Sequence, residues 1–216
     1  MDSAKKLVSE LKVLKPMLAK DEASQDRFNF EANHFYRLAL HHRGFPFTKL
    51  KDCVDMFKTI FTAGLSWDPR ARQVSLLDSQ EGGMSPFVHY QGQIKLASNK
   101  GVIERVTADL LYESDEFEFT GATEMPTLRR KLRKEGMGEA IGGYTISYLQ
   151  SGGVHVELFD IEALQKSEEA GVMTGNGEFW SGPHRREMQR KALINATANR
   201  WLELSYTMKS IKQTLN

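Results

Sequence analysis

Hydrophobic residues in the first third of the chain recur at spacings of three and four, which predicts amphipathic helices. The first helix is expected over residues 3–20, where a stripe of leucines faces one side and Pro16 should kink or end the helix early. Two more helices are expected over residues 25–43 and 49–63, and Gly64 is well placed to cap the second of them.

The pattern then changes to alternation with glycine-containing turns, which predicts short strands and hairpins. A strand region covers residues 102–119, with a hairpin turn near residues 114–115. Other elements are expected between and after these strands. They are strands over 73–78 and 86–90, a hairpin over 144–159, helices over 91–100, 161–169 and 185–204, and a glycine-rich loop over 171–177.

This order of elements predicts an α+β fold in which an antiparallel sheet of hairpins packs with helices. A helical N-terminal extension precedes the sheet, and a long basic helix follows it. The leucine stripe of residues 3–20 has two interpretations, a contact between subunits or packing on the chain's own core, and the sequence favours neither.

The composition excludes only a few kinds of functional site. The 216 residues are 40% hydrophobic and 26% charged, and their formal net charge is +1, so nucleic-acid binding would have to come from local clusters of charge. Cys53 is the only cysteine, which excludes an intramolecular disulfide and a cysteine-rich zinc site and predicts a core residue. His34, His41 and His42 could share a metal, although surface or core histidines are favoured. No membrane span or signal peptide is recognised, so the cytoplasm is expected.

The sequence contains no motif for nucleotide hydrolysis and no nucleophile elbow. The acidic segment 113–118 could serve a metal-dependent nuclease that uses Asp109, Glu113, Asp115 or Glu116. A solvated turn is the favoured interpretation of the segment, because acidic residues are common in turns. The nuclease stays as an alternative.

Two clusters of basic residues indicate a nucleic-acid ligand. The first lies in a glycine-flanked segment between the predicted hairpins, as a basic loop or short basic helix, and consists of Arg129, Arg130, Lys131, Arg133 and Lys134. The second lies on or just before the last helix and consists of His184, Arg185, Arg186, Arg190, Lys191 and Arg200. Because Trp180 and Trp201 intermix with the second cluster, its arginines either form buried ion pairs or line a phosphate-binding groove.

Three segments resemble a known family. Residues 86–119 are similar to the central core of the RecT family, with an aromatic-x-glycine turn at Tyr90 and Gly92 and the sequence Asp-Glu-Phe-Glu-Phe at 115–119. Residues 57–77 resemble the family's helix, G-L-x-x-x-P turn and strand. Residues 178–201 resemble the Red-beta branch, in which a tryptophan precedes a basic helix with a Lys-Ala pair, here Lys191 and Ala192.

The resemblance implies an ATP-independent protein that binds single-stranded DNA and anneals complementary strands in phage-type homologous recombination. It implies no catalytic residues, so the protein is not expected to be an enzyme, and no required cofactor, with a role for Mg²⁺ left open. The implied partners are single-stranded and annealed duplex DNA, further copies in a ring or helical filament, and a phage exonuclease. The implied location is the cytoplasm of a bacterial host. The remaining alternative is a non-catalytic scaffold that binds protein through residues 3–20.

The resemblance also ranks the DNA-binding candidates and divides the chain. By position, the best candidates are Arg185, Arg186 and Lys191, followed by Lys95 and Arg105. Arg200 ranks lower, because Ala198 stands where the Red-beta branch has an arginine. The predicted regions are a helical N-terminal region at 1–48, proposed as an oligomer contact, an annealing core at 49–204 and a tail at 205–216.

Overall fold

The computed structural model describes residues 2–79, 82–131, 137–173 and 177–204. It divides the chain into two compact units, which we call unit 1 (residues 1–99) and unit 2 (residues 100–205). Both units combine helices with antiparallel strands, which confirms the predicted α+β class. The division falls after Asn99, inside the stretch predicted as one core, and does not coincide with the predicted boundary at residue 48.

Three amphipathic helices open unit 1 as predicted. They are α1 (Asp2–Leu18), α2 (Glu22–His41) and α3 (Leu50–Thr62), and a 3-10 turn, η1 (Phe45–Phe47), follows α2. Pro16 lies in the last turn of α1, so the helix ends two residues after it. The leucine stripe is covered by the chain's own α2 and α3, because Leu7, Leu11 and Leu14 are buried and α1 packs on both helices.

An aromatic cluster forms the core of unit 1. Phe35 contacts Trp67 with ring centroids 4.8 Å apart, and Phe28 meets Phe57 edge-on at 5.1 Å. Cys53 is buried in α3 beside this cluster, as predicted. Such aromatic burial is the main hydrophobic contribution to a small domain.

A hairpin and a short helix complete unit 1. They are η2 (Pro69–Ala71), β1 (Val74–Asp78), β2 (Met84–Val88) and α4 (Tyr90–Asn99), close to the predicted positions. Gly92 of α4 lies against the backbone of Gln73, where an added Cβ would come within 2.5 Å of the Gln73 carbonyl oxygen. The aromatic-x-glycine pattern therefore marks a close approach of α4 to the chain before β1.

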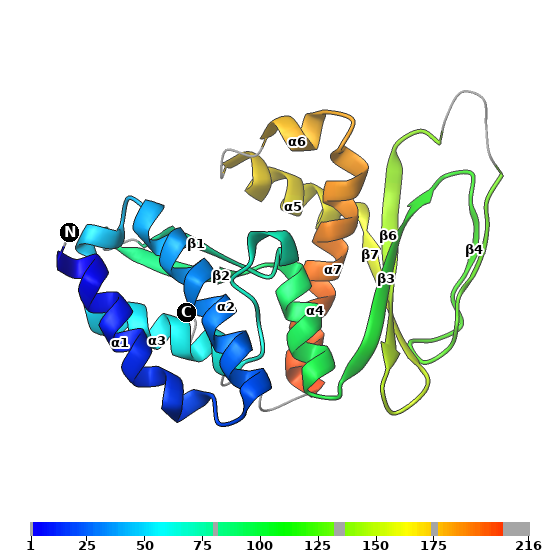
Figure 1. Ribbon diagram of the computed structural model, residues 1–216. Helices are drawn as coiled ribbons and strands as arrows, with labels where there is room; N and C mark the ends of the chain where they lie inside the picture. The colour runs from blue at the N-terminus through cyan, green and yellow to red at the C-terminus, as the bar shows by residue number, and fades with distance from the viewer. Residues whose placement is uncertain (1, 80–81, 132–136, 174–176, 205–216) are drawn as a thin grey trace. The chain divides into compact units, whose positions relative to one another are not determined.

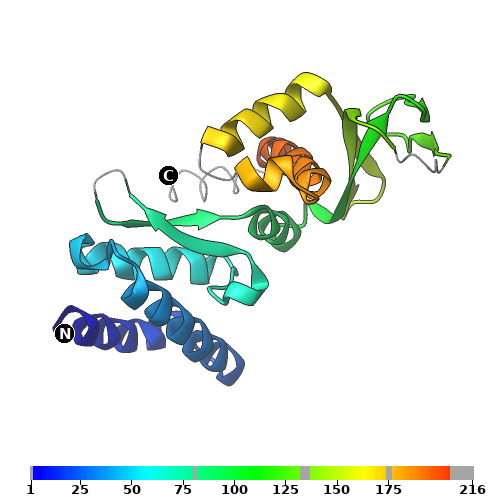
Figure 2. The ribbon, with the colours of Figure 1, turned by 90° about the horizontal axis from the view of Figure 1, so that it is seen from above.

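Unit 2 is a sheet with helices on one face and a small ribbon on the other (Figures 1 and 2). The sheet has the antiparallel order β3-β6-β7. The elements are β3 (Ile103–Tyr112), β4 (Glu116–Glu118), β5 (Thr127–Arg129), β6 (Ala140–Leu149), β7 (Val154–Asp160), α5 (Ile161–Met173), α6 (Gly177–Ser181) and α7 (Arg185–Leu204). Asp160 caps α5 as predicted, since its carboxylate accepts a hydrogen bond from the Ala163 amide at 2.9 Å.

Two predictions for unit 2 were wrong. β4 does not form a hairpin with β3 but pairs with β5, and β3 pairs with β6. The cause is Asp115, whose amide and carboxylate both bond to the Tyr112 backbone and turn the chain away, so that Phe117 packs on Tyr144 with ring centroids 5.0 Å apart. The predicted loop at 171–177 is also partly helical, because α5 continues to Met173 and α6 begins at Gly177.

Candidate nucleic-acid interface

The rotation of α7 is fixed by three contacts with alternate residues of β6. Residues four apart on the helix meet residues two apart on the strand, which matches the periods of the two elements. The pairs are Leu193 with Gly143, Thr197 with Thr145 at 2.6 Å between hydroxyls, and Trp201 with Ser147 at 2.8 Å from Nε1 to Oγ. Leu193, Thr197 and Trp201 are buried on this face of α7. Arg186 and Arg200 are each seven residues from Leu193, so they begin on the same side of the helix.

Arg185 is bound by carboxylates from two other elements. Its guanidinium donates to Glu139, next to β6, and to Glu168 of α5 at 3.0 Å. These hydrogen bonds, with Glu168 contributing most, raise the pKa of Arg185. Arg185 thus ties the start of α7 to its neighbours, and a DNA phosphate would have to compete with both acids.

Arg190 and Arg200 are also paired. Arg190 lies 3.5 Å from Asp109 of β3 and 2.8 Å from Glu187, one turn earlier in α7. Arg200 lies 3.4 Å from Glu157 of β7. The sequence left open whether these arginines form ion pairs or line a groove, and the structure shows ion pairs at both.

Arg186 and Lys191 differ from the other cations of α7. Within the described residues, neither has a carboxylate within ion-pair distance. Arg186 is exposed, donates to the Gly138 carbonyl at 3.4 Å and lies 5.5 Å from the Tyr112 ring centroid. The Lys191 ammonium is 3.9 Å from the Met188 sulfur. These two positive charges remain available to an anionic ligand.

Arg130 of the basic segment is used inside unit 2. It donates to both oxygens of Asp115, to Asp109 at 3.0 Å and to the Leu110 carbonyl, and its guanidinium lies 5.1 Å from the Tyr112 ring centroid. Its hydrogen bonds are the main cause that lowers the pKa of Asp115, whose side chain is only 1% exposed. Arg130 therefore holds the start of β4 against the end of β3.

The ion pairs of Arg130 with Asp109 and Asp115 also argue against the nuclease alternative. Asp109 and Asp115, two of its four candidate carboxylates, are already bound to a guanidinium. A divalent cation at these oxygens would have to displace Arg130 and would meet its positive charge. Glu113 and Glu116 are exposed, as expected for a solvated turn.

Arg129 and Lys131 of the basic segment are exposed. Arg129 lies in β5 opposite Glu116, and Lys131 lies 3.8 Å from the same glutamate. Arg133 and Lys134 fall outside the described residues. The charges on Arg129 and Lys131 are thus accompanied by an acid in the neighbouring strand.

Arg105 does not share a surface with α7. It pairs in register with Tyr148, and its guanidinium lies 3.5 Å above that ring. Tyr148 alternates with Ser147, which contacts α7, so Arg105 and Tyr148 lie on the opposite face of the sheet. Lys95 is exposed in α4 and belongs to unit 1. Within unit 2, Arg105 and the helix α7 therefore lie on opposite faces of the sheet.

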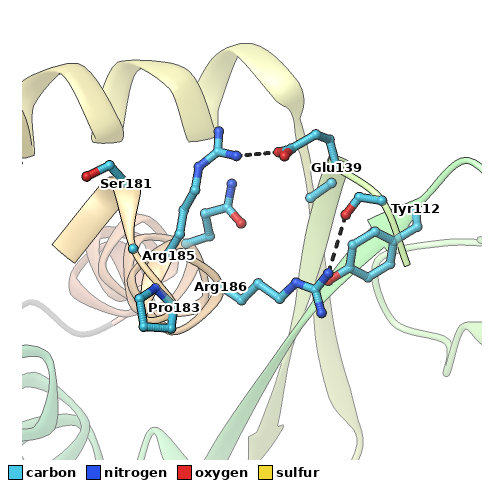
Figure 3. A pocket seen from close by; sticks show the side chains of 10 residues that line it. Tyr112, Glu139, Ser181, Pro183, Arg185 and Arg186 are labelled. Atoms are coloured by element: carbon cyan, nitrogen blue, oxygen red, sulfur yellow. Dashed lines mark hydrogen bonds and ion pairs between the residues drawn. The ribbon is translucent and has the colours of Figure 1, made fainter. Parts of the chain in front are cut away.

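A cavity of about 390 Å³ opens at the N-terminal end of α7, entirely within unit 2 (Figure 3). Arg185 and Glu139 lie together on one side, and Arg186 and Tyr112 lie together on another. The lining consists of Tyr112, Gly138, Glu139, Ala140, Ser181, Gly182, Pro183, Arg185, Arg186 and Gln189. Tyr112, Glu139 and Gln189 were not among the predicted site residues, because no local motif marks them.

In unit 2, an antiparallel sheet carries a long helix on which Arg186 and Lys191 have no carboxylate partner among the described residues. Cations of this kind can contact a nucleic-acid backbone. The family comparison is specific: the model of the RecT family matches residues 48–213. The chain belongs to the RecT family, whose members anneal single strands of DNA in phage-type recombination. No curated protein matches the chain. Among the described residues, none of the helices has the length and apolar character needed to cross a membrane.

Proposed function

We propose that this protein binds single-stranded DNA through Arg186 and Lys191 of α7 and anneals complementary strands without ATP. The observation that carries the assignment of the surface is that Arg186 and Lys191 lack carboxylate partners among the described residues, whereas Arg185, Arg190 and Arg200 have them. Membership in the RecT family supports the annealing activity itself.

Charge neutralisation explains how such a surface would promote annealing. Two complementary strands repel each other through their phosphates, and cations that contact the backbone reduce this repulsion without selecting a sequence. The paired arginines add a fixed frame, because their carboxylates hold α7 in place. We propose Mg²⁺ as dispensable, and further copies of the chain and a phage exonuclease as partners.

Salt dependence of DNA binding tests the assignment of the two cations. Lys191→Ala and Arg186→Ala should each weaken binding to any single-stranded sequence and reduce the slope of log K against log salt by about 0.7, the value for one single-strand phosphate contact. Lys12→Ala, which removes one charge from an exposed position of α1, is the matched control and should leave the slope unchanged. Equal slopes for all four proteins would refute the assignment.

Annealing is tested with two complementary oligonucleotides that carry a fluorophore and a quencher. The protein should accelerate quenching without ATP, and the acceleration should fade as salt rises. A strict requirement for ATP would contradict the proposal. Degradation of the strands that stops on chelation would instead support the nuclease alternative.

A further inference from the structure

Two polar side chains in the wall of the cavity at the start of α7 lack hydrogen-bond partners among the described residues. Gln189 is 3% exposed and lines the cavity, and its carboxamide makes no hydrogen bond to any residue that the structure describes. Tyr112 is also 3% exposed and lines the cavity, and the same holds for its hydroxyl. Among the described residues, the fully buried side-chain nitrogen and oxygen atoms without a partner are Trp67 Nε1 and Trp180 Nε1. The polar ends of Gln189 and Tyr112 are therefore accessible in the cavity, where a ligand can hydrogen-bond to them.

The charge of the cavity wall favours a neutral ligand. Arg185 contributes a positive charge, but Glu139 and Glu168 bind it on both sides. Arg186 is the cation on this wall without a carboxylate among the described residues, and it lies at the exposed side next to Tyr112 (Figure 3). A phosphate inside the cavity would meet Glu139, whereas a phosphate outside could contact Arg186.

We propose that the cavity binds one unpaired nucleobase of the bound DNA strand. The proposal rests on the proposed function, since the strand must first be held by Arg186 and Lys191. The Gln189 carboxamide offers both a donor and an acceptor, and it can turn to match the edge of any base. The Arg186 guanidinium provides a flat surface for stacking. The volume of about 390 Å³ lies within the range of about 300–1,000 Å³ that is usual for small-ligand sites.

Such a site would distinguish single-stranded DNA from the annealed duplex. A base inside the cavity cannot pair with a complementary strand, so it must leave when the duplex forms. The cavity therefore binds the single strand but not the annealed product. It also separates the bases on either side of the captured one, which keeps the strand unstacked.

The test compares two ligands of equal length, oligothymidylate and a strand with the same backbone whose sugars carry no bases. The wild-type protein should bind oligothymidylate more tightly, by about fivefold or more, because a stacked and hydrogen-bonded base adds to backbone affinity. Gln189→Leu should bring this ratio close to one, and Tyr112→Phe, which keeps the ring, should lower it. Gln165→Leu makes the first change at an exposed site of α5 outside the cavity and should leave the ratio unchanged.

The outcomes separate this proposal from the proposed function. Tight binding of both ligands by the wild type, with a ratio near one, would overturn the nucleobase site and leave backbone binding intact. A ratio that survives in both cavity variants would also overturn it, by placing the base contacts elsewhere. Failure of the wild type to bind either strand would refute the proposed function and the site with it. If Gln189→Leu does not fold, Tyr112→Phe decides.

Discussion

Arg130 offers the sharpest test of how unit 2 is held together, because the sequence placed it among the DNA-binding candidates and the structure engages it in ion pairs with Asp109 and Asp115. The change is Arg130→Met, which keeps much of the length of the side chain but removes its charge and donors. Asp115, with a side chain 1% exposed, would then lose its guanidinium partner and keep only the Tyr112 amide. Removing one partner of a buried ion pair costs about 3–5 kcal/mol, and we expect about 3 kcal/mol, since Arg130 itself is 21% exposed.

The loss of stability in Arg130→Met should depend on pH, because the pKa of Asp115 differs between the wild type and the variant. In the wild type, Arg130 lowers the pKa of Asp115, so the pair stabilises the fold above the unfolded pKa of about 3.9 and loses its effect as the pH falls through the lower, folded value. In Arg130→Met, burial without a partner should raise the pKa of Asp115. The variant's deficit in stability should therefore shrink as the pH falls from about 7 toward 5.

Urea unfolding followed by tryptophan fluorescence measures the effect, since Trp180 and Trp201 both belong to unit 2. The double variant Arg130→Met/Asp115→Asn removes the buried charge as well and should be more stable than Arg130→Met alone at neutral pH. Unchanged stability of Arg130→Met, combined with weaker DNA binding, would show that Arg130 serves the ligand and not the fold. A deficit that grows at lower pH would refute the assigned role of Asp115.

Three further predictions concern the two cores. Gly143→Ala should destabilise unit 2 by about 1–3 kcal/mol in urea unfolding, because its Cβ would come within 2.5 Å of Leu193 Cδ1; wild-type stability would show that α7 can shift on β6. Trp201→Phe should cost about 1–3 kcal/mol in the same assay by leaving the Ser147 hydroxyl unpaired, and Trp201→Phe/Ser147→Ala should recover part of the loss. Burial raises the pKa of Cys53 to about 11, so its alkylation in the native state should stay slow from pH 7 to 9 and become fast in urea; rapid native labelling would contradict its core position.

Many of the helices and strands could be predicted from the local spacing of hydrophobic residues and glycines. The helices α1, α2, α3 and α7 have long amphipathic repeats, and the hairpin of β6 and β7 has a glycine turn between alternating strands, so each element carries its own signal. The prediction failed at β4, where alternation predicted a strand correctly but not its partner. Pairing depended on Asp115 and Arg130, residues whose contact joins segments fifteen positions apart.

The candidate site shows the same division. The sequence by itself determined that α7 is helical and basic, and that the chain resembles the RecT family. Only the tertiary structure decided which cations are neutralised, because Asp109, Glu139, Glu157 and Glu168 come from other elements. It also created the cavity that Gln189 lines, since the rotation of α7 is set by packing on β6. Helical period and charge are local properties of a sequence, whereas ion pairing and burial depend on which distant segments meet.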